Sequence, residues 1–140
     1  MNSEFTVAVH SLVFLAYLPE HMASSETIAR NVSTNPTRIR KIMSFLREQG
    51  FVKTKEGVGG GYMLNCDPQK VTLAQIYRAM ACGALKPNWN SGDPGQDCLV
   101  ASNMQSVMDH IFREAEVQYR RCLEQTTICD VLEQVKHCQS

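Results

Sequence analysis

Apolar residues recur along this chain at the spacing of helices, and the first such stretch is residues 5–18. Valine, leucine, alanine and phenylalanine occur almost all round this segment, which is typical of a buried helix. Pro19 disfavours helical backbone at the residue before it, so the helix should end there. Ser24 can then cap a shorter second helix, residues 25–31, with Glu26 in the first turn where the helix dipole favours an anion. We expect residues 5–18 to be scaffold.

A third helix is predicted to run from residue 36 to Gly50. Asn35 can cap it, and Pro36 takes the first position, where a missing N–H is tolerated. Four apolar residues share one face and must pack against the rest of the domain: Ile39, Ile42, Met43 and Leu46. At about 100° per residue, the opposite face is polar and cationic. It carries Thr37, Lys41 and Ser44, flanked by Arg38 and Arg40.

A β-hairpin should follow this helix. Residues 51–55 are β-prone and hold two lysines, and residues 62–64 return as a second strand. Between them, residues 57–61 contain four of the chain's eight glycines, which makes a thin, permissive tip. The polar turn at residues 31–34 gives the two preceding helices the form of a helix-turn-helix. Together these elements predict a winged helix.

The chain after the hairpin is predicted to be helical with one long loop. A helix capped by Thr72 should end near Gly83, with its apolar face formed by Leu73, Ile76, Tyr77 and Met80. Residues 84–97 contain two prolines and two glycines and are typical of an irregular loop. A loop of this length is often functional.

A long helix is predicted from Cys98 to about residue 125. Its apolar stripe comprises Val100, Met104, Val107, Met108, Ile111, Ala115 and Cys122, widened by Phe112 and Tyr119. An ordinary core helix would explain the stripe, but the earlier apolar helices already supply a core. We therefore favour a helix that pairs with its copy in a homodimer. Residues 128–135 should form a last short helix.

The predicted fold class is mostly α with a small β wing. Residues 1–82 form a winged helix-turn-helix DNA-binding domain and residues 83–97 a sensor-type loop. Residues 98–140 comprise the dimerisation helix and the C-terminal helix.

Charge is unevenly distributed along the chain, although its formal net charge is zero. Seven Lys and Arg against one Glu between residues 30 and 55 give a local net charge of +6. A solvated face would be the ordinary explanation for an isolated charge run. Because this one coincides with a helix-turn-helix and a wing, it favours neutralisation of DNA phosphates.

The N-terminal segment gives no sign of membrane targeting. It has no basic run followed by an apolar region, and its longest apolar run, residues 12–18, is far below the ~20 residues needed to cross a bilayer. We expect a soluble, cytoplasmic protein.

Six cysteines are spread along the chain, and no two form a CxxC pair. Zinc-finger spacing is therefore absent, and we expect reduced thiols and no bound metal. Cys98 at a predicted helix N-terminus could have a lowered thiol pKa, and Cys82 is a candidate resolving partner for a redox switch. An inert Cys98 is an equally good reading. For Cys66, Cys122, Cys129 and Cys138 we favour packing as small apolar residues.

Three segments together resemble the Rrf2 family of bacterial winged-helix transcription regulators. They are SSETIARNVSTNPTRIRKIMSFLREQG (residues 24–50), GVGGGY (57–62) and VTLAQIYRAM (71–80), and the resemblance covers about residues 5–124. It implies a homodimer with crossing long helices, a recognition helix in the major groove of double-stranded DNA and a wing against the minor groove. The operator would then be a pseudo-palindrome.

The residues expected to contact DNA combine this resemblance with the charge pattern. Thr37, Arg38, Arg40 and Lys41 match the family's DNA-contacting helix, and residues 55–62 match its wing. The full predicted set is Ser24, Thr37, Arg38, Arg40, Lys41, Ser44, Lys53, Lys55, Gly57, Gly59, Gly60, Gly61 and Tyr62.

One departure from the family concerns its cofactor. Many members hold an iron–sulfur cluster with three cysteines in the loop before the dimer helix. Residues 83–97 contain none, and Cys98 alone falls where the last of those cysteines sits. One thiolate cannot replace the four protein ligands that a cluster usually takes. The chain therefore resembles the cluster-less branch, and we expect no cofactor.

The sequence is compatible to different degrees with three classes of function. A DNA-binding repressor that senses redox, a small effector near Trp89 or a protein co-repressor fits the basic ridge and wing. The alternative is a protein-interaction module that regulates a partner without binding DNA. An enzyme is disfavoured, because residues 57–62 do not form a GxGxxG motif and no catalytic motif is present.

Overall fold

The first apolar stretch forms α1 (Glu4–Tyr17) in the computed structural model, which describes residues 3–80 and 89–138. Ala8, Leu12 and Leu15 are fully buried, so α1 is the scaffold helix expected from the sequence. Leu18, just before Pro19, has extended backbone and ends the helix. Tyr17 is 61% exposed, so burial does not extend all round α1 as its composition suggested.

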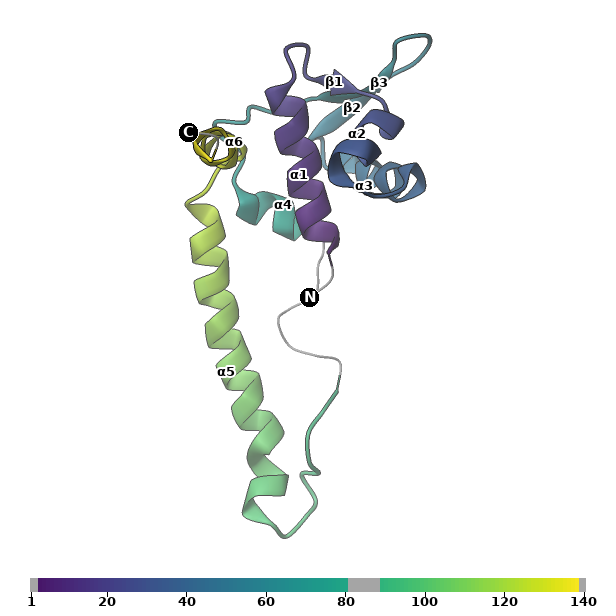
Figure 1. Ribbon diagram of the computed structural model, residues 1–140. Coiled ribbons are helices and arrows are strands. Elements are labelled where there is room, and N and C mark those ends of the chain that lie inside the picture. Colours follow the sequence, from purple (N-terminus) through teal and green to yellow (C-terminus); the bar gives the residue numbers. More distant parts are fainter. Residues whose placement is uncertain (1–2, 81–88, 139–140) are drawn as a thin grey trace. The chain divides into compact units, whose positions relative to one another are not determined.

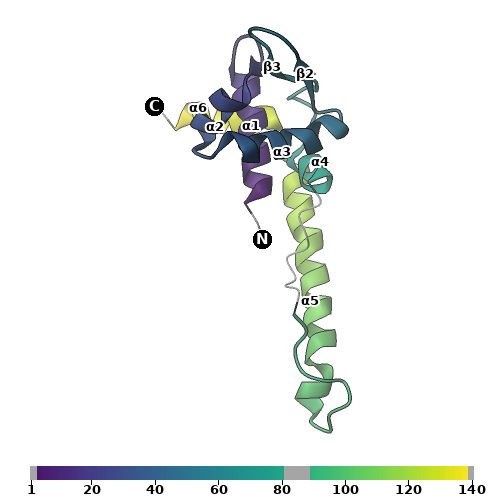
Figure 2. The same ribbon diagram turned by 90° about the vertical axis from the view of Figure 1, so that its right-hand side faces the viewer.

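One compact unit combines two segments of the chain, Asn2–Cys82, which contains α1, and Leu123–Ser140. Within it, α6 (Ile128–His137) and the pair α2 (Ser25–Val32) and α3 (Pro36–Glu48) flank α1 (Figure 1). A second view shows the same arrangement from the side (Figure 2). The other unit is Gly83–Cys122.

Both helices of the helix-turn-helix begin where the sequence predicted, whereas α2 ends one residue later than predicted and α3 ends at Glu48, two residues before Gly50. The Ser24 side chain accepts a hydrogen bond from the Thr27 amide, and the Asn35 side chain accepts one from the Arg38 amide at 2.8 Å. Ser33 adopts a left-handed conformation (φ 67°) and ends α2. The predicted α3 core face is confirmed, since its four apolar side chains are at most 1% exposed.

A three-stranded antiparallel sheet carries the wing, with strand order β1-β3-β2. β2 (Val52–Lys55) and β3 (Gly61–Leu64) form the predicted hairpin, in which Lys55 is opposite Gly61. β1 (Met22–Ala23) was not predicted. Two residues are too few for an alternating pattern, and β1 exists because it pairs with β3.

α4 (Leu73–Ala79) has the predicted Thr72 cap, reinforced by a reciprocal hydrogen bond from the Thr72 amide to the Gln75 side chain. Its buried face differs from the prediction by one position, because Ala74 is buried whereas Leu73 is partly exposed. The predicted helix end at Gly83 lies outside the described residues, and α4 ends at Ala79.

The C-terminal helix α6 lies in the same unit as the N-terminal elements, whereas the sequence interpretation grouped it with the long helix. Ile128 is fully buried and Leu132 is 9% exposed. The Leu73 amide donates to the Thr126 carbonyl at 2.8 Å, and the Ile128 amide donates to Val71. These tertiary contacts, which local spacing does not reveal, attach α6 to the α1 and α4 region.

The unit Gly83–Cys122 contains most of α5 (Leu99–Glu124), the long helix that the sequence predicted. Its described loop, residues 89–97, forms no helix or strand, as expected. The Asp93 amide donates to the Ala101 carbonyl at 3.0 Å, so the loop folds onto the first turn of α5. No described α5 side chain is buried in the single chain. Val100, Val107 and Ile111 are 49–61% exposed.

Candidate nucleic-acid interface

The outer face of α3 carries the polar and cationic side chains that the helical spacing predicted. Thr37, Arg40 and Lys41 are exposed, while Arg38 and Ser44 are partly buried. The face is held in place because the opposite side of α3 is embedded in the core. A rigid helix that presents donors to solvent is the element that enters the major groove in helix-turn-helix proteins.

Arg40 connects this face of α3 to the first turn of α2. Its guanidinium donates to the Ser25 hydroxyl at 3.1 Å and lies 3.6 Å from the Glu26 carboxylate. Glu26 has a lowered pKa, first because its carboxylate accepts a hydrogen bond from its own backbone amide, then because of the Ser25 hydroxyl, with Arg40 adding to the effect. These contacts therefore fix the direction in which the Arg40 side chain projects from α3.

Two further cations of α3 contact the beginning of α1. The Arg38 guanidinium donates to the Ser3 hydroxyl, and the Lys41 ammonium lies 4.0 Å from the Glu4 carboxylate. Lys41 remains exposed, with 66% of its side chain accessible. An exposed ion pair at this distance is weak, so the Lys41 ammonium can exchange this carboxylate for a phosphate.

Ser24 caps α2, as the sequence predicted, in addition to its assignment as a DNA contact. Its hydroxyl accepts from the Thr27 amide and donates to the Thr27 hydroxyl at 3.0 Å. The side chain is partly buried. Ser24 therefore fixes the N-terminus of α2, where backbone amides form a positive end suited to a phosphate.

The wing carries the other predicted contacts. Lys53, Lys55, Gly57 and Gly59 are exposed, and Gly60, Gly61 and Tyr62 are partly buried. Close backbone approach explains two of the glycines. A Cβ on Gly60 would lie 2.1 Å from the Lys55 carbonyl oxygen, and one on Gly61 would lie 2.4 Å from that of Ala23.

Val58 occupies the tip of the wing and is not among the predicted DNA contacts, although residues 55–62 as a whole match the family's wing. Its side chain is fully exposed. The sequence signal is its position, because an apolar residue between two glycines at a hairpin tip is expected to be exposed. Proteins that bind the minor groove often insert apolar side chains between base steps.

The wing is joined directly to the end of α3. The Phe51 amide donates to the Leu46 carbonyl at 2.9 Å, and the Asn65 side chain donates to the Gly50 carbonyl at 3.1 Å. Gly50 has a φ of 84° and reverses the chain between the helix and β2. These bonds therefore attach the wing to the end of α3 within the same unit.

The candidate thiol sensor lies in the other unit. Cys98 is exposed, and the backbone amides of Ala101 and Val100 lower the pKa of its thiol. Cys82, its candidate partner, lies outside the described residues. Burial and then the neighbouring Asp67 raise the pKa of Cys66 to about 11. Cys122 and Cys138 are exposed, so the prediction that they pack as small apolar residues is wrong for the single chain.

Among residues 3–80 and 89–138, no three His, Cys, Asp or Glu side chains come together as metal ligands. Within the same ranges, no helix combines the length and the apolar character needed to cross a membrane.

Known relatives match most of the length of the chain. YwnA of Bacillus subtilis strain 168, named as a candidate HTH-type transcriptional regulator, is 29% identical over 136 residues, covering 94% of this chain and 96% of YwnA. A crystal structure of a candidate transcriptional regulator from Lactobacillus plantarum has a TM-score of 0.81 at 26% identity and covers 98% of this chain and 92% of that one.

The structure of CymR, titled the global cysteine regulator of B. subtilis, shares the fold with a TM-score of 0.68 at 21% identity, covering 96% of each chain. Residues 1–134 match the sequence profile of the Rrf2 family, described as "Iron-dependent Transcriptional regulator". These matches are to transcriptional regulators and not to enzymes. The chain therefore belongs to the Rrf2 family of DNA-binding transcriptional regulators.

Proposed function

We propose that this protein is a dimeric, sequence-specific repressor that binds double-stranded DNA through α3 and the wing. The observation that carries the proposal is the exposed face of Thr37, Arg40 and Lys41 on a helix whose other face is buried. A local net charge of +6 between residues 30 and 55 supplies the attraction to phosphates. Its target DNA would place its action in the cytoplasm.

The proposed contacts divide into two kinds. Thr37, Lys41 and Ser44 are assigned to base edges and nearby phosphates of the major groove, with Arg38 and Arg40 beside them. The N-terminus of α2 at Ser24 would face a phosphate. On the wing, the remaining predicted contacts are to the sugar–phosphate backbone at the minor groove, from Lys53, Lys55, Gly57, Gly59, Gly60, Gly61 and Tyr62.

Dimerisation is proposed to run through α5. Its exposed apolar side chains include Val100, Met104, Val107 and Ile111, which recur at spacings of three and four residues. Such a stripe would remain in water in the single chain and can be covered by a second copy. Two recognition helices about 34–36 Å apart would then read a pseudo-palindromic operator.

We propose that the regulator works without the iron that the family description names. A cluster or metal site would need several thiolate or imidazole ligands close together. Residues 83–97 hold no cysteine, and Cys98 is exposed beside no described cluster of ligands. The donor set therefore does not fit such a group. A thiol switch at Cys98 is the proposed alternative. Cys98 directly precedes α5, and its oxidation would be the signal that changes DNA binding.

Sequencing the DNA that purified protein retains from fragmented genomic DNA tests the proposal. We expect enrichment of one pseudo-palindromic site, and weaker enrichment after mild peroxide if Cys98 carries the signal. An absorbance spectrum of the same preparation checks the cofactor, and a brown sample would contradict the cluster-less assignment. Retention of all fragments alike would count against sequence-specific binding.

A further inference from the structure

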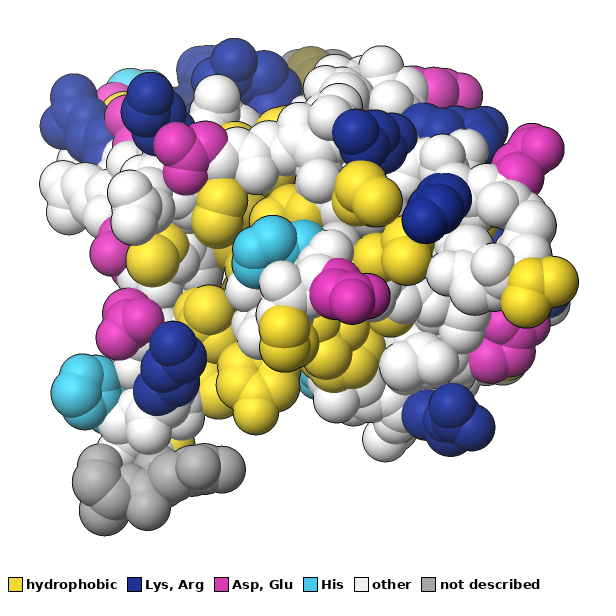
Figure 3. Space-filling model, turned by 90° about the horizontal axis from the view of Figure 1, so that it is seen from above, with side chains coloured by type: hydrophobic (Ala, Val, Ile, Leu, Met, Phe, Trp, Pro, Cys, Tyr) yellow, Lys and Arg dark blue, Asp and Glu magenta, His cyan; other side chains and the backbone are white. Residues whose placement is uncertain are grey.

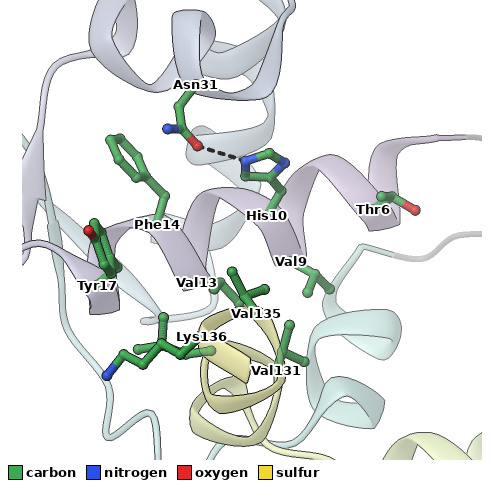
Figure 4. A pocket seen from close by; sticks show the side chains of 11 residues that line it. Thr6, Val9, His10, Val13, Phe14, Tyr17, Asn31, Val131, Val135 and Lys136 are labelled. Atoms are coloured by element: carbon green, nitrogen blue, oxygen red, sulfur yellow. Dashed lines mark hydrogen bonds between the residues drawn. The ribbon is translucent and has the colours of Figure 1, made fainter. Parts of the chain in front are cut away.

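A groove between α1 and α6 forms a cavity of about 480 Å³ on the unit that contains the helix-turn-helix (Figure 4). Val9, Val13 and Phe14 line it from α1, and Val131 and Val135 line it from α6. Cavities of a few hundred cubic ångströms with apolar walls are typical of small-molecule sites. Val135 is 54% exposed, so the groove opens to solvent.

Each polar side chain of this groove can donate a hydrogen bond, and one of them is cationic. The side chains of His10 and Asn31 form a hydrogen bond of 2.8 Å at the edge of the groove nearest α2. Lys136 of α6 and Tyr17 of α1 also line the groove (Figure 4). None of the described residues that line the groove has a carboxylate. The space-filling view shows hydrophobic side chains gathered on one face, with Lys, Arg, Asp, Glu and His side chains around them (Figure 3). Among the residues that line the groove itself, one cation and no carboxylate favour an anionic ligand with an apolar body.

Lys136 is available to such a ligand. Its ammonium pairs with Glu133 at 3.5 Å, one turn earlier on α6, and both side chains are more than half exposed. Exposed pairs of this kind contribute little stability. A ligand carboxylate can therefore replace Glu133 as the partner of Lys136 without a large loss of protein stability.

The groove reaches the DNA-reading helices through Asn31. This residue lies in the last turn of α2, and the left-handed Ser33 and the start of α3 follow within five residues. A ligand that displaces the His10–Asn31 hydrogen bond would act on the end of α2. The groove therefore joins a ligand site to the turn of the helix-turn-helix.

We propose that this groove is an effector site for a small carboxylic acid with an aromatic or branched hydrocarbon body of about ten non-hydrogen atoms. The hydrocarbon lies between the valines of α1 and α6, and the carboxylate contacts Lys136 and Tyr17. Occupancy changes the affinity for operator DNA. The regulatory half of this proposal rests on the proposed DNA binding, whereas ligand binding itself does not.

The first experiment titrates 3-phenylpropanoate into the full-length ¹⁵N-labelled protein and follows amide shifts. The neutral 3-phenylpropanamide, of the same size, is the matched probe. We expect saturable shifts in α1, α6 and Asn31 with half-saturation below about 1 mM, which is within reach of a ligand of this size. The amide should bind at least about 5-fold more weakly, because it does not pair with Lys136.

Variants locate the site. Lys136→Gln should weaken binding of the acid by about 5-fold or more and leave the amide unchanged. Lys70→Gln, at an exposed lysine outside the groove, should change neither. Val135→Glu places a carboxylate on the wall and should abolish binding of the acid while the protein remains folded, since Val135 is exposed.

The outcomes separate the two halves of the proposal. Shifts that do not saturate, or acid binding unaffected by both α6 variants, would overturn the site. A dimer that Val135→Glu converts to monomers would show that a second copy covers the groove, which also contradicts it. Bound acid with unchanged affinity for a recognised operator refutes the effector role. Bound acid without any DNA recognition leaves the site standing and refutes the proposed function.

Discussion

The guanidinium of Arg40 on α3 lies 3.6 Å from the carboxylate of Glu26 on α2. This pair joins the first turn of α2 to the second turn of α3 in the helix-turn-helix. It fixes the direction of a cation on the face assigned to DNA, and it makes the geometry of that face sensitive to the charge on Glu26.

Acid should weaken the unit partly through Glu26. Because its folded pKa lies below its ordinary value of 4.5, its contribution to stability is present above that value and is lost as the pH falls through the folded pKa. We expect the melting temperature of the wild type to fall more steeply below pH 4.5 than that of Glu26→Gln. Thermal unfolding followed by circular dichroism measures this. Parallel curves would remove Glu26 from the account.

Ser24 can be tested as a cap and as a phosphate site separately. Ser24→Ala removes the hydroxyl that accepts from Thr27 and should lower the free energy of unfolding by about 1 kcal/mol. Ser24→Asp keeps an acceptor for the cap, so stability should be retained, but the added charge should repel a phosphate. Urea unfolding and operator binding are measured on both. Undiminished DNA affinity in Ser24→Asp would contradict the assigned phosphate contact.

Gly61 should be intolerant of a side chain. A Cβ there would lie 2.4 Å from the Ala23 carbonyl oxygen, so Gly61→Ala must separate β1 from β3. We expect a loss of about 1–3 kcal/mol in the free energy of unfolding. Val58→Ala, at the exposed tip, is the control and should leave stability unchanged. Equal stability of both variants would mean that the sheet yields easily at this position.

Cys98 should be alkylated well before Cys66. The Cys98 thiol is exposed and has a lowered pKa, whereas Cys66 is partly buried with a pKa of about 11. Since the thiolate is the reactive species, iodoacetamide at neutral pH should modify Cys98 first. Mass spectrometry of digested protein after short exposures gives both rates. If Cys66 reacts as fast as Cys98, the thiol-switch assignment loses its basis.

Ile111 should be needed for the dimer. Its side chain is 49% exposed in the single chain and belongs to the apolar stripe of α5. Ile111→Glu should convert a dimer to monomers, because a buried unpaired carboxylate costs several kcal/mol. Glu114→Gln, at an exposed polar position of the same helix, is the control. Sedimentation equilibrium measures both masses. A monomeric wild type would refute the dimer itself.

Features with a local cause were predictable from the sequence. The caps at Ser24, Asn35 and Thr72 depend on a side chain and an amide three residues later, and the core face of α3 depends only on helical spacing. The winged helix and the family follow from those elements.

Features made by distant contacts were not predictable. β1 exists only through pairing with β3, and α6 joins the N-terminal unit because Ile128 is buried there. The sequence interpretation took Val9 and Val13 as scaffold. It did not foresee that they would line a groove with α6, because a groove between two helices depends on how those helices pack.

The most direct test of the central claim, that the exposed face of α3 reads DNA, is a fluorescence anisotropy titration of the operator over a range of salt concentrations. We expect Lys41→Ala to bind about 3–10-fold more weakly than the wild type and to reduce the slope of log affinity against log salt by about 1. Lys70→Ala, at an exposed lysine outside α3 and the wing, should match the wild type. Identical affinity and slope for Lys41→Ala and the wild type would contradict the account.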